Sequence, residues 1–239
     1  MKLSLQTICM SMLLIAVTTE VYSQRETSPH DREFSFLSNN INPLSNYKLS
    51  TEATYESLVA NAEGSQFYDE TFKKATISDT ENVFNVRYNA FLDAMEIVNG
   101  DDIALLDKEY QKHLISFPES NVHYKVLWEQ HTNAKASLAY FVLLEDNNYL
   151  SLYRKDSKKY VPSRTHRTSD KGKFQNVRSR FYVEINHTGK AIPLPRTNKE
   201  FAALFSDKRA QIVAYMKSKN LKVRTENDLL QLIQYINTL

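Results

Sequence analysis

Cysteine and glycine are scarce in this chain of 239 residues, which contains one cysteine, Cys9, and four glycines. Its longest apolar stretch, residues 8–17, is well short of the roughly 20 residues that a bilayer-spanning helix needs. So few glycines exclude a glycine-rich phosphate-binding loop. We also expect no transmembrane helix in the mature chain.

The N-terminus has the pattern of a secretory signal peptide over residues 1–23. Lys2 gives it a positive start, an apolar core follows, and Val21 and Ser23 occupy the −3 and −1 places of a cleavage site. Cleavage after Ser23 would make Gln24 the new N-terminus. The alternative is a retained helical anchor, which the shortness of the apolar core disfavours.

Cleavage would remove Cys9, and this limits the chemistry of the exported chain. Without a thiol, the mature protein can form no disulfide, no cysteine nucleophile and no thiolate metal site. We expect a protein of the periplasm, the outer membrane surface or the extracellular space.

The remaining sequence divides into three parts that differ in composition and in the spacing of apolar residues. Residues 24–63 form a polar leader that we expect to be irregular. Residues 64–195 consist of short alternating segments separated by turn residues, with the hairpin signal Asn99-Gly100 among them. Tyrosine (14) and phenylalanine (12) are abundant, which suits strands. This pattern predicts a mainly β protein, an antiparallel meander that forms a curled sheet, a sandwich or a barrel-like structure.

Residues 196–239 change to a helical period and predict two to three helices packed on the β domain. Thr225 and Asp228 have the spacing of a capping box for a helix over residues 226–237. The apolar positions of this helix follow i, i+3, i+4, i+7 spacing and form one stripe, which needs a surface to cover it.

The segment FNVRYN, residues 84–89, mixes strand alternation with polar side chains. One interpretation is a half-buried strand with its polar face in water. The other places Arg87 inside a curled sheet, paired with a carboxylate such as Glu96 on the next strand, because a buried arginine needs a partner. In either case we expect Arg87, Tyr88, Asn89 and Glu96 to be structural.

These residues also resemble a known family. Its features are Gly64-Ser-Gln-Phe-Tyr68, Val86-Arg-Tyr-Asn89, Met95-Glu96 and a helical C-terminus that ends at Leu239. The pattern is similar to a family of uncharacterised exported proteins of Bacteroidetes-type Gram-negative bacteria. The chain departs from that pattern mildly, with valine where leucine is usual and glutamine where proline is common. The resemblance implies export and a shared fold, but no activity and no catalytic residue.

Charge is nearly balanced overall, with a net charge of +2, but residues 154–180 contain ten basic and two acidic side chains. One interpretation is a loop that binds an anion such as lipid phosphate or an acidic glycan; the other is a solvated loop balanced by acidic surface elsewhere. Nucleic acid is not expected for an exported protein. The candidate anion-binding residues are Arg164, Arg167, Lys171, Lys173, Arg178 and Arg180.

Motifs for catalysis or metal binding are lacking: the sequence has neither HExxH nor GxSxG. We therefore predict no catalytic residues, no metal site and no cofactor. The favoured function is a non-enzymatic β scaffold of the bacterial envelope that binds either another protein or an anionic envelope component. The alternatives are a hydrolase of an envelope polymer, whose carboxylates the linear sequence does not reveal, and a carrier of an apolar ligand inside a hollow barrel.

Overall fold

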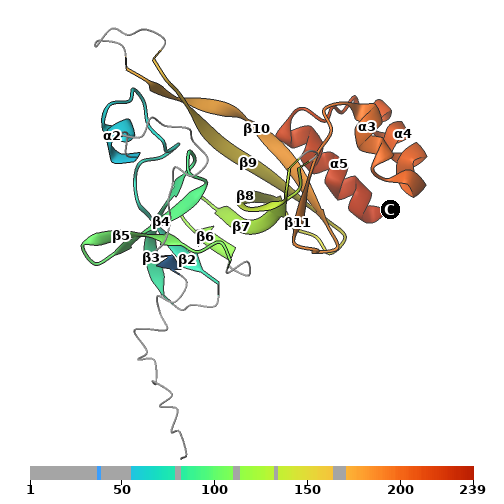
Figure 1. Ribbon diagram of the computed structural model, residues 1–239. Coiled ribbons are helices and arrows are strands. Elements are labelled where there is room, and N and C mark those ends of the chain that lie inside the picture. The colour runs from blue at the N-terminus through green and yellow to red at the C-terminus, as the bar shows by residue number, and fades with distance from the viewer. Residues whose placement is uncertain (1–36, 39–54, 79–81, 110–113, 132–133, 164–170) are drawn as a thin grey trace, which may run out of the picture. The chain divides into compact units, whose positions relative to one another are not determined.

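The middle of the chain, where apolar and polar residues alternate, forms a sheet of eleven strands in the computed structural model (Figure 1). The structure describes residues 37–38, 55–78, 82–109, 114–131, 134–163 and 171–239. All of them belong to the unit Ser35–Leu239. Outside the described residues lie the predicted signal peptide, most of the predicted polar leader, Arg164 and Arg167.

The strands are β1 (Leu37–Ser38), β2 (Lys73–Ile77), β3 (Val83–Asn89), β4 (Ala94–Asn99), β5 (Asp102–Leu106), β6 (Leu114–Phe117), β7 (Val122–Glu129), β8 (Ser137–Glu145), β9 (Leu150–Val161), β10 (Lys173–Ile185) and β11 (Lys190–Pro193). The two longest strands are β9, with 12 residues, and β10, with 13 residues. The helices are α2 (Tyr55–Ala60), α3 (Asn198–Ala203), α4 (Arg209–Lys219) and α5 (Glu226–Thr238), with the 3-10 turn η1 (Ser206–Lys208).

The order of the strands is β1-β5-β4-β3-β2-β6-β7-β11-β10-β9-β8, and β7 pairs with β8 as well. Strands β7 to β11 therefore form a closed ring of five, and β6 to β1 form an open sheet that extends from it. The first half of β7 pairs with β6, and its last residues pair with β11. The β7–β11 pairing is parallel, whereas the other pairings are antiparallel. The predicted mainly β, mostly antiparallel fold is confirmed.

The interior of the ring is filled by large side chains. Phe141 of β8 packs edge-on against Tyr153 of β9 and Tyr182 of β10, with ring centroids 6.3 and 4.9 Å apart. Leu127 and two alanines complete this cluster. Edge-to-face aromatic pairs add stabilisation beyond the area they bury, and these rings occupy the space that an apolar ligand would need.

The C-terminal helices cover the outer side of the ring. Leu150 and Leu152, which alternate with inward-facing residues on β9, share a hydrophobic cluster with the apolar stripe of α5 and with buried residues of α3 and α4. The stripe of α5 is fully buried and consists of Leu229, Leu232, Ile233 and Ile236. Each such side chain contributes about 1.5–3 kcal/mol by burial. The side chain of Thr225 accepts a hydrogen bond from the backbone N–H of Asp228, so the predicted cap is present.

Candidate functional site

Arg87 of β3 lies directly opposite Glu96 of β4 in the register of the sheet. Its Nε and Nη2 atoms are each 2.7 Å from Glu96 Oε2. The guanidinium is also held between two aromatic rings, 4.0 Å from the centroid of Phe67 and 4.2 Å from that of Phe72. This combination of ion pair and cation–π stacking uses the planar shape of arginine. It matches the second interpretation of the FNVRYN segment.

Asn89 extends the same network into the interior. Its Nδ2 donates to Glu96 Oε1 at 2.8 Å and to the Tyr55 hydroxyl of α2 at 2.9 Å, and its Oδ1 accepts from the backbone N–H of Phe91 and Leu92. Asn89 and Glu96 are buried. The interpretation of FNVRYN as a strand with its polar face in water is therefore wrong at Asn89. Because these polar atoms are satisfied by one another, the network fixes the register of β3 and β4 and joins α2 to them.

Two further buried carboxylates, which sequence reasoning missed, lie inside the ring. Glu184 of β10 accepts hydrogen bonds from Tyr153 Oη at 2.7 Å, Lys125 Nζ at 3.0 Å and the backbone N–H of Gly189 at 2.7 Å. Burial tends to raise the pKa of Glu184, but the hydrogen bonds from Tyr153 and Lys125 outweigh it and lower that pKa below its ordinary value. Glu184 therefore stays ionised at neutral pH.

Glu129 of β7 has a similar set of partners. It accepts a hydrogen bond from Tyr182 Oη at 2.5 Å and forms an ion pair with Lys155. Burial again acts to raise the pKa of Glu129, and the Lys155 ammonium with its hydrogen bond lowers it overall. Burial is also the main cause of the raised pKa of Tyr182. Each carboxylate thus forms an ion pair with one lysine and accepts a hydrogen bond from one neutral tyrosine, an arrangement suited to holding the ring together.

Histidines contribute little to any cluster in the described part of the chain. His123 Nδ1 lies 2.9 Å from Ser116 Oγ, and His131 Nε2 lies 4.0 Å from Glu129 Oε2. Groups of three or more His, Cys, Asp or Glu side chains that could bind a metal ion do not occur among the described residues.

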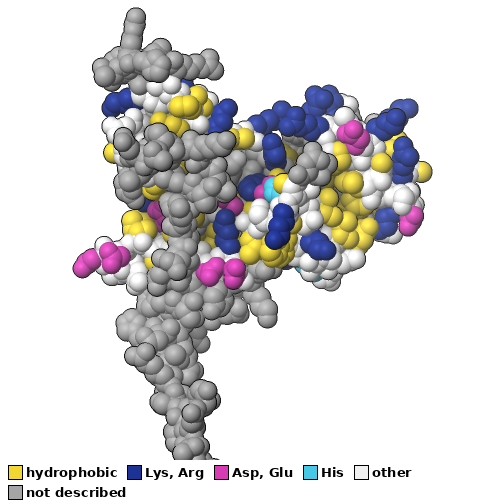
Figure 2. Space-filling model, in the orientation of Figure 1, with side chains coloured by type: hydrophobic (Ala, Val, Ile, Leu, Met, Phe, Trp, Pro, Cys, Tyr) yellow, Lys and Arg dark blue, Asp and Glu magenta, His cyan; other side chains and the backbone are white. Residues whose placement is uncertain are grey.

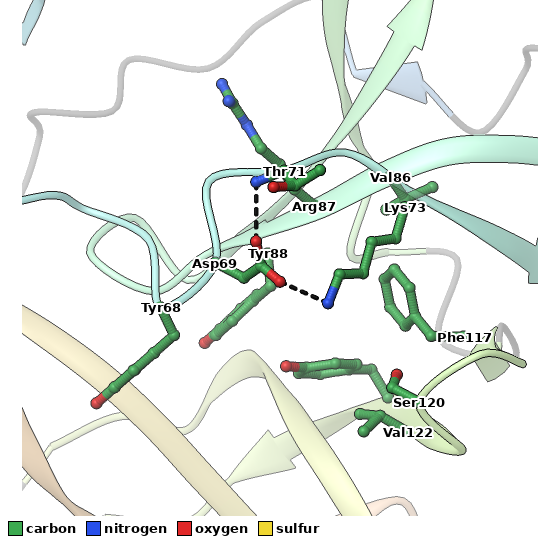
Figure 3. Close-up of a pocket in the computed structure, with 11 residues that line it drawn as sticks. Tyr68, Asp69, Thr71, Lys73, Val86, Arg87, Tyr88, Phe117, Ser120 and Val122 are labelled. Carbon is green, nitrogen blue, oxygen red and sulfur yellow. Dashed lines mark hydrogen bonds and ion pairs between the residues drawn. The ribbon is translucent and has the colours of Figure 1, made fainter.

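A small pocket of about 190 Å³ lies between β3, the turn that joins β6 to β7, and the segment that precedes β2 (Figure 3). Its wall includes Tyr88, Tyr124 and Phe117, whose rings contact one another with centroids 5.1 and 5.9 Å apart. Arg87 contributes only the part of the residue nearest the backbone, since its guanidinium group points away from the pocket in Figure 3. The pocket can accept a small ring-shaped or apolar group.

The rim of this pocket carries a closed ion pair. Asp69 Oδ2 is 2.5 Å from Lys73 Nζ, and Asp69 Oδ1 accepts a hydrogen bond from the backbone N–H of Thr71 (Figure 3). The hydrogen bond from Lys73 lowers the pKa of Asp69 to about 2. Asp69 is therefore ionised at neutral pH and its charge is compensated by the ion pair with Lys73, so this pair gives the pocket no surplus charge with which to attract an ion.

The basic stretch at residues 154–180 is largely strand rather than the long loop we expected. Strand β9 continues to Val161 and β10 begins at Lys173, and the two pair along most of their length. The loop expectation is wrong because lysine and arginine occupy the solvated faces of both strands and hide their alternation, while Phe174 of β10 is buried.

The basic side chains of this hairpin differ in their contacts. Arg154 pairs with Asp156 and Glu226, and Lys155 pairs with Glu129. Their charge is therefore compensated within the fold. The described candidate anion-binding residues, in contrast, are exposed, and they are Lys171, Lys173, Arg178 and Arg180.

Arg178 and Arg180 lie in a groove of about 600 Å³ between β10, the end of β11 and the connection from α4 to α5. Arg196 and Arg224, which are distant in the sequence, line the same groove. We call it the arginine groove. Its lining contains no carboxylate, and within the described ranges none of the four arginines forms an ion pair. Lys171 and Lys173 are not part of it.

A second groove of about 580 Å³ lies between α3 and α4. Its lining also contains no carboxylate, and it includes four basic residues: Lys199, Arg209, Lys217 and Lys222. We call it the lysine groove. Figure 2 shows Lys and Arg side chains gathered around the C-terminal helices and the neighbouring part of β10. A count of charge along residues 154–180 could not reveal this surface, because most of its members come from residues 196–224.

Comparison with known proteins adds no relative: no family model, curated protein or solved structure matches the chain. Among the described residues, no helix has the length and apolar character needed to cross a membrane.

Proposed function

We propose that this chain is an exported, non-enzymatic β-scaffold protein of the bacterial envelope, which binds an anionic envelope component in the arginine groove. The signal-peptide pattern of residues 1–23 supports export. The resemblance to exported proteins of Bacteroidetes-type bacteria supports an envelope location. The binding role is carried by one observation, the four arginines that line one groove without a carboxylate.

Uncompensated arginines in a groove favour an anionic ligand for a physical reason. Like charges that share a concave surface repel one another, and a low-dielectric wall strengthens their combined field. A bound anion removes that repulsion. The planar guanidinium forks of Arg178, Arg180, Arg196 and Arg224 can each bind a carboxylate or phosphate group through two parallel hydrogen bonds.

The buried carboxylates support a binding role over hydrolysis. Glu96, Glu129 and Glu184 are each paired with a basic side chain and accept further hydrogen bonds inside the fold. A general acid must have a proton available near neutral pH, whereas the pKa values of Glu129 and Glu184 are lowered. The packed ring interior likewise offers little support for an apolar carrier.

The test is retention on a carboxymethyl matrix at low ionic strength. One variant replaces Arg178, Arg180, Arg196 and Arg224 by alanine. Its matched control replaces four exposed lysines outside both grooves by alanine, and these are Lys74, Lys135, Lys159 and Lys190. Both variants have the same net charge, so a difference between them reports the position of the charge and not its amount.

We expect the arginine variant to elute at a clearly lower salt concentration than the control variant. The four arginines that it lacks share one groove and attract an anion together, whereas the four control lysines are spread over the surface. At 0.1 M salt the Debye length is about 10 Å, so charges spaced farther apart than this act separately. Circular dichroism and urea unfolding check that both variants are folded. Equal elution of the two variants would mean that the groove is only part of a diffuse solvated surface, and the proposed binding site would be abandoned.

A further inference from the structure

The arginine groove and the lysine groove meet at two chain segments. Arg196 lines the first groove and Lys199 the second; Val223 and Arg224 line the first, Leu221 and Lys222 the second. Asn198 fastens these segments together, because its Nδ2 donates to the carbonyl of Leu221 at 3.0 Å and its Oδ1 accepts from the N–H of Val223 at 3.2 Å.

We infer that the two grooves form one site for an acidic polysaccharide, a chain of anionic sugar units that lies across both. This inference rests on the proposed function, since it specifies the anion that the arginine groove binds. Eight basic side chains line the two grooves together, and a small anion could contact only a few of them. A chain with repeated charges could engage both grooves at once.

Helix stability explains the position of Lys217, which lies in the last turn of α4, but it does not explain that of Arg209. Arg209 is the first residue of α4, which has no acidic residue in its first turn. A cation at a helix N-terminus is unfavourable, because it faces the positive end of the helix dipole. Neighbouring carboxylates make other contacts: Asp207 accepts a hydrogen bond from Ser206, Glu200 accepts one from Thr197, and Asp228 accepts one from the N–H of Lys222.

The walls between the basic groups distinguish a polysaccharide from a bare polyanion. Phe181, Pro193, Leu194 and Pro195 contribute apolar surface to the arginine groove, and Val213, Met216 and Leu221 contribute it to the lysine groove. The C–H face of a sugar ring can pack on such a surface while its carboxylate reaches an arginine. An inorganic polyphosphate has no apolar face to bury there.

The experiment titrates the full mature chain with trigalacturonate and with dodecagalacturonate by isothermal calorimetry. We expect the longer oligomer to bind at least about a hundredfold more tightly, because its second contact is intramolecular once the first has formed. Replacement of Lys199, Arg209, Lys217 and Lys222 by alanine should remove most of this gain, so that the ratio between the affinities of the two oligomers falls to less than about tenfold. The four-lysine control variant described above should retain the gain.

Each failure points to a different claim. If the lysine-groove variant binds dodecagalacturonate as tightly as the wild type, the single two-groove site is wrong, while loss of binding in the arginine variant would still support the proposed function. If inorganic polyphosphate of matched charge binds as tightly as dodecagalacturonate, the sugar-specific part of the inference is overturned. If the arginine variant binds both oligomers normally, the proposed function fails as well.

Discussion

Replacing Lys125 by methionine leaves the carboxylate of Glu184 without its ion-pair partner inside the ring. The resulting loss in the free energy of unfolding measures how strongly this ion pair stabilises the fold. Glu184 is 1% exposed and the Lys125 side chain 27% exposed. Removing one partner of a fully buried pair costs about 3–5 kcal/mol. Here the cost should be lower, about 2–3 kcal/mol, because Lys125 is partly solvated and Glu184 keeps the hydrogen bonds from Tyr153 and Gly189.

A double-mutant cycle separates the pair from its surroundings. Glu184→Gln alone should cost about 1–2 kcal/mol, since Lys125 can then turn toward water. The double variant, Lys125→Met with Glu184→Gln, should cost less than the two single variants added together, with a coupling of at least about 1.5 kcal/mol. Urea unfolding at pH 7 measures all four proteins. The exposed Asp69–Lys73 pair, treated in the same way, is the control and should show much weaker coupling.

The pH dependence gives an independent check on the same carboxylate. Burial opposes ionisation of Glu184, but its hydrogen bonds lower the folded-state pKa, so on acidification the unfolded chain takes up a proton first. The stabilisation is therefore present above the unfolded pKa of about 4.3 and is lost as the pH falls through the lower folded pKa. The stability difference between wild type and Glu184→Gln should shrink below about pH 4. Two results would contradict a stabilising ion pair. One is a double variant whose loss of unfolding free energy equals the sum of the two single losses within about 0.5 kcal/mol. The other is a stability difference between wild type and Glu184→Gln that stays the same at low pH.

Two other predictions follow from the sequence motif and the N-terminus. Arg87→Lys keeps the charge but loses the planar stacking on Phe67 and Phe72, and it should lower the free energy of unfolding by about 2 kcal/mol, whereas Arg178→Lys on the exposed face of β10 should leave it unchanged within about 0.5 kcal/mol. If the chain is exported and cleaved after Ser23, mass spectrometry of the intact protein should give the mass of residues 24–239. A mass that includes Met1, or that of a chain lipidated at Cys9, would contradict this prediction.

Local patterns predicted the elements whose exposed and buried faces differ clearly. The alternation of β3 and the stripe of α5 identify their elements because a mainly apolar set lies on one face. Arg87 could be matched with Glu96 because a short turn places neighbouring strands in a narrow range of registers. Strand β10 was only partly predicted, since its basic residues continue along a solvated face where no apolar contrast marks the strand.

Contacts between distant segments could not be predicted in this way. Arg196 and Arg224 join Arg178 and Arg180 only after α3 and α4 have packed on the ring, so no window of sequence contains the whole groove. Glu129 and Glu184 look like ordinary strand residues in the sequence. Their role depends on closure of the ring, which brings a lysine and a tyrosine from other strands to each of them.

Strand β7 belongs both to the closed ring and to the open sheet, and this has a consequence for how the protein is made. Parallel pairing with β11 requires the chain to complete β8, β9 and β10 before the final edge of β7 is covered. Until β11 has been synthesised and has docked, that edge presents unpaired N–H and C=O groups, which could recruit a foreign strand. Assembly of the ring is therefore a late, non-local event, and chains that still lack β11 should depend on chaperones that shield strand edges.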